Sequence, residues 1–261
     1  MTLERLYLVE VASKHWDGPM SLAIQVTDSQ VQQVIDFVSQ SELLSQRKNI
    51  AYHLLFKISP SYPINPLRIL GHKFVTTPYV FFNDIDFIPS YGLYDNLKDI
   101  ISNINGMNKT ALVVPAFETD NPEVNYPKIR QEMIDMIQRS QVWQFHKHWP
   151  PGHAPTDYRR WARNTTTAPY TVTWKQSYEP YIAAKTSVVP FDPRFVSRCD
   201  NKISHNEELH MDGYHFIVVH NGFLIHMPHP LSDRSILYPN NCYVNRYNEW
   251  KKEKQEQYRR H

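Results

Sequence analysis

The chain contains one Asp-x-Asp triplet, Asp84-Ile85-Asp86, directly after the apolar run of residues 79–82. In an extended backbone, residues i and i+2 point to the same side, so both carboxylates can converge on one hard cation. The apolar run predicts a buried strand, and open α/β sheets bind ligands beyond the carboxyl ends of their strands. A divalent ion held there can neutralise a nucleotide diphosphate. Such triplets also end strands as ordinary turns, so the pattern alone leaves metal binding and a structural turn open.

Three histidines, His220, His226 and His229, lie within the segment VVHNGFLIHMPHP. Imidazole is a good ligand for a transition-type ion such as Mn²⁺, and two carboxylates with one histidine make a chemically sensible set. Because Pro228 excludes a regular helix, the two histidines of His-Met-Pro-His need not share a face. The alternative is that one histidine is a ligand and the others are packed or face solvent.

Residues 205–212 hold three acids, Glu207, Glu208 and Asp212. A transferase that inverts at a sugar carbon needs one carboxylate to deprotonate the incoming hydroxyl. The structural alternative for an acid in such a stretch is a helix cap or a surface charge. This stretch is therefore one place to look for a general base.

The charge balance and the glycine count exclude two common classes of binding protein. There are 28 Lys and Arg against 26 Asp and Glu, a net charge of +2, which gives no electrostatic case for nucleic acid as a partner. The seven glycines form neither a GxGxxG nor a GxxxxGK[ST] motif, so any phosphate must be bound without a glycine-rich loop.

Targeting and modification signals in the sequence are few. No apolar run of 18 residues occurs, so no membrane segment is expected in this chain, and the first residues lack a signal-peptide core. Cys199 and Cys242 allow one disulfide at most. Sequons at Asn108 and Asn164 permit a secretory-pathway interpretation without proving it.

The first half of the chain alternates helix-like and strand-like segments. The expected helices cover residues 3–16, 28–38, 65–76 and 93–104, and the expected strands cover residues 20–26, 50–57, 79–82 and 111–116. This alternation predicts an α/β fold with a mostly parallel sheet and crossover helices. Since the chain opens on a helix, the strand that normally precedes such a helix is expected to be missing.

The second half differs in amino-acid composition and in its pattern of expected elements. His, Trp, Pro and Tyr crowd residues 143–181, and short strand-like pieces then alternate with loops. No low-complexity linker or internal repeat divides the chain, so we predict a single domain over residues 1–261. It is expected to comprise a nucleotide-sugar-binding half at 3–140, an irregular acceptor and metal-completing half at 141–250, and a charged, solvated or frayed tail at 251–261.

The segment PYVFFNDIDFIPSYGLYDNL resembles the donor site of family-49 glycosyltransferases, in particular the C-terminal glucuronyltransferase domain of LARGE-type enzymes. The resemblance covers residues 3–250 and is more specific than the Asp-x-Asp triplet alone. Further segments match in the same order: LVVPAFET (112–119), GHAPTDY (152–158), TTTAPYTVTW (165–174), YEPYI (178–182), DPRFV (192–196) and IHMPH (225–229).

The resemblance implies a Rossmann-like glycosyltransferase A fold, a Mn²⁺ ion, UDP-glucuronate as donor and inversion to a β-linked product. The implied acceptor is a xylose-terminated glycan of the matriglycan type on O-mannosylated α-dystroglycan or a similar glycoprotein. The implied location is the Golgi lumen, with an anchor that this chain does not contain. The paired xylosyltransferase domain of such enzymes is also absent from this chain.

Site residues follow from the resemblance position by position. Asp84 and Asp86 fall on the family's Asp-x-Asp, and His226 falls on a family histidine that we take as the third metal ligand ahead of His229. Glu208 falls on a family acid and is assigned as the general base. Residues expected to bind the glucuronate carboxylate or the phosphates are Arg68, Asn201 and Lys202.

The chain departs from the family pattern at residues 197–200, Ser-Arg-Cys-Asp, where relatives carry glycines and an aromatic residue. We expect this departure to affect acceptor use, since glycine lets a sugar approach the backbone closely. A second departure is Ile69, where an asparagine usually follows the arginine. The alternative function is a catalytically impaired glycan-binding or scaffold relative of the same fold, which would have no need of the metal-binding residues that this chain keeps.

Overall fold

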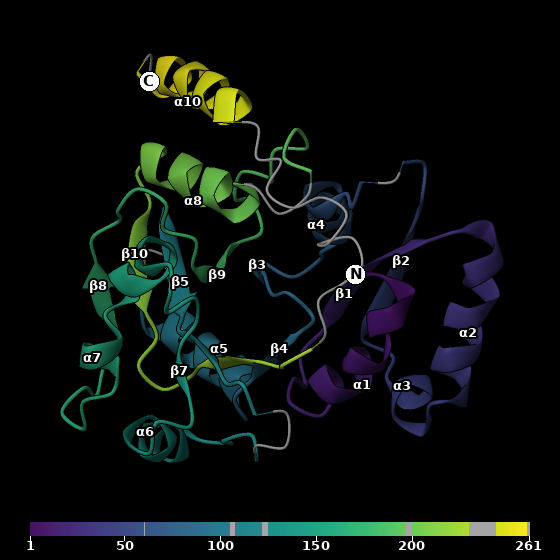
Figure 1. The fold of residues 1–261 in the computed structure, drawn as a ribbon, viewed down its shortest axis with the longest axis horizontal. Helices are drawn as coiled ribbons and strands as arrows, with labels where there is room; N and C mark the ends of the chain where they lie inside the picture. The colour runs from purple at the N-terminus through teal and green to yellow at the C-terminus, as the bar shows by residue number, and fades with distance from the viewer. Residues whose placement is uncertain (60, 105–107, 122–124, 197–199, 230–243, 260–261) are drawn as a thin grey trace.

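The computed structural model describes residues 1–261 except 60, 105–107, 122–124, 197–199, 230–243 and 260–261 (Figure 1). The α-helices are α1 (Tyr7–Ser13), α2 (Val31–Gln40), α3 (Glu42–Gln46), α4 (Ile64–Lys73), α5 (Leu93–Asn103), α6 (Arg130–Gln138), α7 (Tyr158–Trp161), α8 (Asn201–Met211) and α10 (Val244–Tyr258). The strands are β1 (Met20–Val26), β2 (Ile50–Phe56), β3 (Tyr79–Phe81), β4 (Phe87–Pro89), β5 (Thr110–Val114), β6 (Ala116–Glu118), β7 (Trp143–Gln144), β8 (Tyr170–Val172), β9 (Tyr181–Lys185), β10 (His215–Val218) and β11 (Leu224–His226). Short 3₁₀ turns are η1 (Leu3–Arg5), η2 (Asp28–Gln30), η3 (Pro150–Gly152) and η4 (Ala154–Thr156).

The central sheet has five strands in the order β3-β9-β5-β10-β8. β5 is buried at every position because both of its faces are covered, which matches its continuous apolar sequence. β10 runs parallel to β5, whereas β9 runs antiparallel to both β3 and β5. β3 and β5 therefore share a direction, as the strand–helix alternation predicts, but they are not neighbours.

The prediction of a mostly parallel sheet is wrong. Among the described residues, three strand pairs are parallel and five are antiparallel. Two of the antiparallel pairs arise because β9, from the irregular half, inserts between β3 and β5. Its sequence position gives no sign of this pairing, since strand partners distant in the chain leave no local pattern. The fold is a mixed α/β structure.

Three strands of the central sheet continue directly into a second sheet of four strands, ordered β4-β11-β6-β7. Residues 82–86 connect β3 to β4, Pro115 connects β5 to β6, and residues 219–223 connect β10 to β11. Pro115 has no N–H for the ladder, and its carbonyl instead accepts a hydrogen bond from the Leu224 N–H at 2.8 Å. We call this junction of the two sheets the seam. It brings the Asp-x-Asp loop, the end of β6 and the end of β11 to one place.

The N-terminal region forms a separate two-stranded parallel sheet, with β1 and β2 paired from Met20–Ile50 to Val26–Phe56. Apolar residues of α1, α2 and these strands share one core cluster. On the other edge of β1, Thr2 pairs with Gln25 in a parallel bridge. That a strand before residue 3 is missing stays a prediction.

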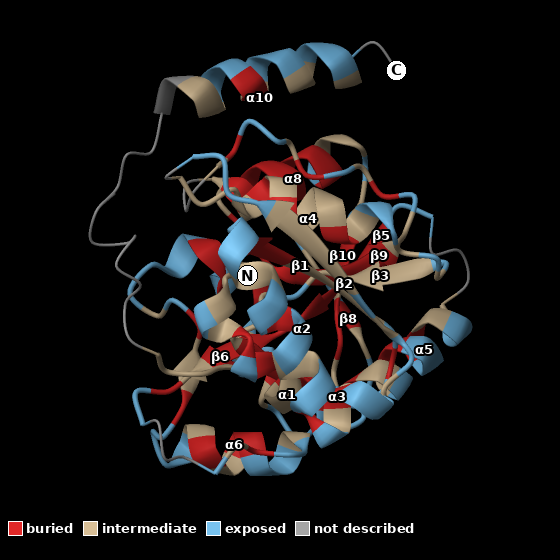
Figure 2. Cartoon of the chain, turned by 90° about the vertical axis from the view of Figure 1, so that its right-hand side faces the viewer, coloured by how far each residue is buried: buried red, intermediate tan, exposed pale blue. Residues whose placement is uncertain are grey.

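The charged C-terminal segment is a helix that packs on α8 rather than a freely solvated tail (Figures 1 and 2). Trp250 of α10 is fully buried. Glu207 of α8 is buried and accepts contacts from Lys251, at 2.6 Å, and from the Tyr247 hydroxyl. The charges of this segment predicted solvation, but two of its three lysines, Lys251 and Lys254, pair with carboxylates on the neighbouring helix.

No helix in the described part of the chain combines the length and apolar character that crossing a bilayer requires.

Candidate active site

A cavity of about 2170 Å³ opens along the seam. Side chains from η1, α4, the Asp-x-Asp loop, β6, α8 and β11 reach it. Its charged and imidazole lining is Glu4, Arg5, Arg68, His72, Lys48, Lys98, Asp84, Asp86, Glu118, His146, Glu179, Lys202, His205, His226, His229 and Arg246.

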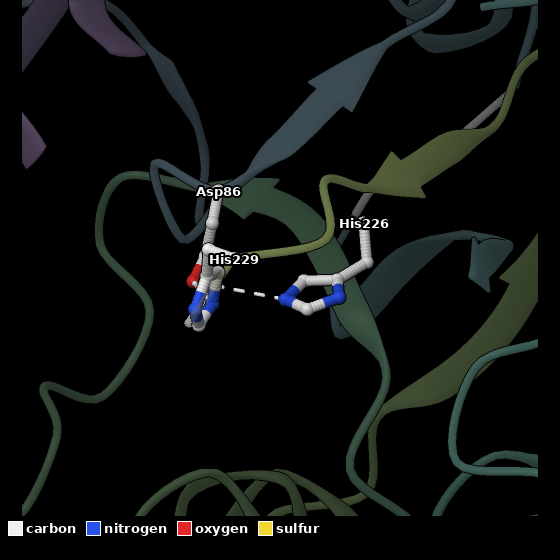
Figure 3. A group of neighbouring side chains, drawn as sticks. All are labelled: Asp86, His226 and His229. Atoms are coloured by element: carbon white, nitrogen blue, oxygen red, sulfur yellow. Dashed lines mark hydrogen bonds and ion pairs between the residues drawn. The ribbon is translucent and has the colours of Figure 1, made fainter. Parts of the chain in front are cut away.

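Asp86, His226 and His229 form one group of ligating side chains, which we call the Asp86 group (Figure 3). The Asp86 Oδ2 atom lies 3.1 Å from His229 Nε2 and 3.8 Å from His226 Nε2. One ligand atom from each residue lies within 4.8 Å of the other two. A carboxylate oxygen with two imidazole nitrogens is a donor set that suits a divalent transition-type ion.

Strand pairing sets the positions within this group. Asp86 directly precedes β4, and β11 pairs antiparallel with β4 so that His226 lies opposite Phe87. The Met227 N–H donates to the Asp86 carbonyl at 2.8 Å and extends this pairing past the end of the ladder. His229 follows after Pro228, which turns the chain back toward the carboxylate.

The guanidinium of Arg5 contacts the same group. Its Nη1 lies 2.5 Å from Asp86 Oδ2, and its Nη2 lies 3.0 Å from His229 Nδ1. Burial by itself would raise the pKa of Asp86, but contacts from His226, His229 and Arg5 outweigh it and hold that pKa well below its usual range. The carboxylate is therefore ionised and attracts positive charge at neutral pH.

Asp84 faces two basic side chains. Arg68 Nη2 donates to its Oδ1 at 2.9 Å, the Tyr181 hydroxyl donates to its Oδ2 at 3.0 Å, and Lys202 Nζ lies 3.5 Å from Oδ2. Burial would raise the pKa of Asp84, but Arg68 and Lys202 together lower it to about 2. Because the folded-state pKa lies below the unfolded value, this pairing stabilises the fold at neutral pH and is lost as the pH falls toward 2.

The two carboxylates of the triplet therefore contact different groups of side chains. The expectation of an extended backbone, with both carboxylates on one side, did not predict this. The Phe87 N–H donates to the Asp84 carbonyl at 3.0 Å and closes a turn, so the triplet is not extended. Asp86 points to the histidines and Asp84 to Arg68 and Lys202. The structure thus brings His229 beside Asp86 and His226, and it places Asp84 outside that group.

The structure brings the three expected donor-binding residues together. Arg68 Nη1 donates to Asn201 Oδ1 at 2.5 Å, and Lys202 Nζ donates to the Tyr181 hydroxyl at 2.8 Å. Asn201 and Lys202 are the first two residues of α8, and Arg68 lies on α4. With Asp84 they make one polar network on the wall of the cavity.

Glu208 lies apart from this network. It is 2% exposed, and its Oε1 contacts Lys254 Nζ at 2.7 Å and the Tyr258 hydroxyl at 3.1 Å, both on α10. It lies six residues after Lys202 on a helix with 3.6 residues per turn, and so on a different face. The structure therefore does not place Glu208 where an acceptor hydroxyl could reach it.

We expect Lys254→Ala to lower the free energy of unfolding by about 3 kcal/mol, because it leaves the Glu208 carboxylate buried with Tyr258 alone. Chemical denaturation followed by circular dichroism measures this. Lys252→Ala is the matched control, since Lys252 is exposed on the same helix, and its effect should stay within about 0.5 kcal/mol. Equal effects of the two substitutions would contradict a structural role for the Glu208 pair.

Sequence reasoning did not single out Arg5, Tyr181, Glu118 or Glu179. The last three stand within the segments PAFET and YEPYI, so a search of the matched segments for polar residues would have found them. Arg5 gives no such signal, because its partner Asp86 lies 81 residues away.

Several sequence-based expectations fall on residues that the structure does not describe. These include positions 197–199 of the segment linked to acceptor use and the possible pairing of Cys199 with Cys242. Both sequon asparagines, Asn108 and Asn164, are described and exposed.

Residues 59–258 match a protein family described as "Glycosyl-transferase for dystroglycan". The chain is 43% identical over 231 residues to "Xylosyl- and glucuronyltransferase LARGE2s" of Gallus gallus, covering 88% of this chain and 31% of the relative. It is 40% identical over 231 residues to "Xylosyl- and glucuronyltransferase LARGE1" of Homo sapiens, covering 88% of this chain and 30% of the relative. The chain thus spans about a third of the length of the curated relatives that it matches.

Proposed function

The chain belongs to the glycosyl-transferase family for dystroglycan, and from this premise we propose that it transfers glucuronate from UDP-glucuronate to a xylose-terminated glycan on a dystroglycan-like glycoprotein. The observation that best supports the proposal is the joint position of the Asp86 group and the Arg68–Asp84–Lys202 network on one cavity. We further propose that the fold is a Rossmann-like glycosyltransferase A fold acting in the Golgi lumen.

The donor set of the Asp86 group fits a divalent ion, which we propose to be Mn²⁺. Asp86, His226 and His229 would hold it. When bound, such an ion supplies positive charge that stabilises the diphosphate as it leaves. Arg5 already lies against Asp86 and His229, so its guanidinium is placed to share the phosphate charge.

Lys202 and Arg68 supply two positive charges against the single carboxylate of Asp84. This excess suits a donor that carries a carboxylate on its sugar as well as two phosphates. Lys202 donates a hydrogen bond to Tyr181 and pairs with Asp84, and its ammonium has further N–H donors. We therefore propose that Lys202 binds the glucuronate carboxylate.

The acceptor hydroxyl must lose a proton as it attacks the anomeric carbon. Glu118 lines the cavity at the end of β6, opposite His226 in the register of β6 and β11. Its Oε1 accepts hydrogen bonds from Trp143 Nε1 at 2.9 Å and from the Lys147 N–H, which fix its orientation. We assign the general-base role to Glu118 because it combines this access with a position beside the Asp86 group.

A transfer assay tests the proposal. The chain is given UDP-glucuronate and a xylose-terminated acceptor, with Mn²⁺ or with a chelator, and the product is identified by mass spectrometry. We expect a glucuronate added to the acceptor only when Mn²⁺ is present. Mn²⁺-independent binding of the glycan without transfer would instead favour the scaffold alternative.

For Lys202→Gln we expect the preference for UDP-glucuronate over UDP-glucose, as a ratio of kcat/KM values, to fall about 10- to 100-fold. The reason is the loss of one charge-assisted hydrogen bond, worth about 1.5–3 kcal/mol. Lys185→Gln is the control, since Lys185 donates to Asn108 at the surface and does not line the cavity. An unchanged ratio in Lys202→Gln would remove Lys202 from sugar recognition.

A further inference from the structure

A second group of ligating side chains lies outside the Asp86 group. It consists of His146, His153 and Glu179, which we call the Glu179 group. One nitrogen from each histidine and one carboxylate oxygen lie within 4.8 Å of one another. Nothing in the proposed transfer reaction uses these three residues.

The backbone holds the Glu179 group together. His153 lies between η3 and η4, and Glu179 lies two residues before β9. The Glu179 N–H donates to the Gly152 carbonyl at 2.9 Å, which fixes Glu179 beside His153. A Cβ at Gly152 would lie 3.2 Å from Glu179 Oε1 and 2.5 Å from the Trp149 ring, so this close approach depends on glycine.

His153 has a nitrogen that lacks a partner. The residue is 1% exposed, and its Nε2 is buried and has no hydrogen-bond partner among the described residues. Burial lowers the pKa of His153 to about 3, so the ring is neutral and keeps a lone pair for a ligand. A buried polar atom without a partner is costly, and its presence calls for an explanation such as a bound ion.

His146 is held in place by its surroundings. Its φ of 54° lies in the left-handed region, which is uncommon for non-glycine residues and costs conformational energy. Its ring stacks on Phe145 with centroids 4.0 Å apart, and its Nδ1 lies 3.5 Å from Glu179 Oε1. Strain of this kind is common where a side chain is aimed at a ligand.

We propose that His146, His153 and Glu179 bind a second divalent transition ion, of the zinc class. Two imidazoles and one carboxylate, with a remaining open position, are a frequent zinc donor set. The positive charge of Lys202 acts on Glu179, but the Lys202 ammonium itself contacts the Asp84 carboxylate at 3.5 Å and donates to the Tyr181 hydroxyl at 2.8 Å. The ring of Phe145 contacts both His146 and His226 and so separates the two groups.

Co²⁺ is the probe, because its visible absorption reports the coordination of a bound ion. The Asp86→Ala/His226→Ala chain, whose Asp86 group is disabled, is titrated with Co²⁺ and compared with the same chain carrying a further substitution. We expect one Co²⁺ per chain with the absorption of a four- or five-coordinate ion. His146→Ala or Glu179→Gln should weaken this binding at least tenfold, and His153→Ala should abolish it.

His148→Ala is the matched control, because His148 is an exposed histidine two residues from His146 and outside the group. Circular dichroism confirms that each variant is folded. His146 is half-exposed, so its substitution tests the site even where His153→Ala does not fold. Absence of Co²⁺ binding, or binding that His146→Ala and Glu179→Gln leave unchanged, overturns the proposal. Loss on His148→Ala would show surface binding only and overturns it too.

Discussion

Asp86→Ala is expected to lower Mn²⁺-dependent transfer about 10³-fold while leaving the protein folded. Among the described residues, Asp86 is the carboxylate that contacts both His226 and His229, so its loss removes the anionic ligand of the group and the carboxylate partner of Arg5. A lost contribution of about 4 kcal/mol to transition-state charge stabilisation corresponds to this factor. The transfer rate at saturating donor and the affinity for Mn²⁺ should fall together.

Asp95→Ala provides the control for general effects of removing an acid. Asp95 is exposed on α5, where it pairs with Lys98 at the surface. Its transfer rate and Mn²⁺ affinity should match those of the unaltered chain. Full transfer by Asp86→Ala with unchanged Mn²⁺ affinity would contradict the assignment of the Asp86 group as the ion site.

Glu118→Gln is expected to reduce transfer roughly 10²- to 10⁴-fold while leaving UDP affinity nearly unchanged. The amide keeps the shape of the side chain and can still accept the hydrogen bond of Trp143, but it cannot take a proton from the acceptor hydroxyl. The loss should appear in kcat and should be independent of Mn²⁺ concentration. Pre-steady-state transfer and UDP binding by calorimetry measure the two quantities separately.

Glu208→Gln distinguishes the two candidate general bases. The family resemblance assigns this role to Glu208, whereas the lining of the cavity assigns it to Glu118. The structure gives Glu208 a role in holding α10, so its amide variant should lose stability and keep its kcat at a temperature where it is folded. If Glu208→Gln loses kcat and Glu118→Gln does not, the general base is Glu208 and the assignment from the cavity is wrong.

Local sequence patterns predict most of the elements around the site. The helices expected at 65–76 and 93–104 correspond to α4 and α5, and the apolar run at 79–82 corresponds to β3. Periodicity and capping act over a few residues, and these elements are set on that scale. The pairing of β9 between β3 and β5 depends on contacts between residues about 70 to 100 positions apart, which no local pattern encodes.

In the candidate site, too, some features are predictable from the sequence and others depend on contacts between distant residues. The family resemblance predicts Asp86, His226 and Lys202 as site residues, and all three line the same cavity. The split roles of Asp84 and Asp86 depend on a single turn hydrogen bond, and the role of Glu208 depends on α10, which reads as solvated from its charges alone. Pairings of this kind are decided by packing between elements and are not visible in composition.

The seam has a consequence for drug-like ligands of this chain. The four-stranded sheet that carries His226 and Glu118 consists of strands of two or three residues, which have few ladder hydrogen bonds to resist opening. A molecule that binds residues at the start of β4 and at the end of β11 together therefore stabilises the state in which the ladder of this sheet is formed. At a concentration of 100 times its Kd, it adds about 2.7 kcal/mol to the folded state. A donor analogue would thus serve as a pharmacological chaperone for unstable variants as well as an inhibitor.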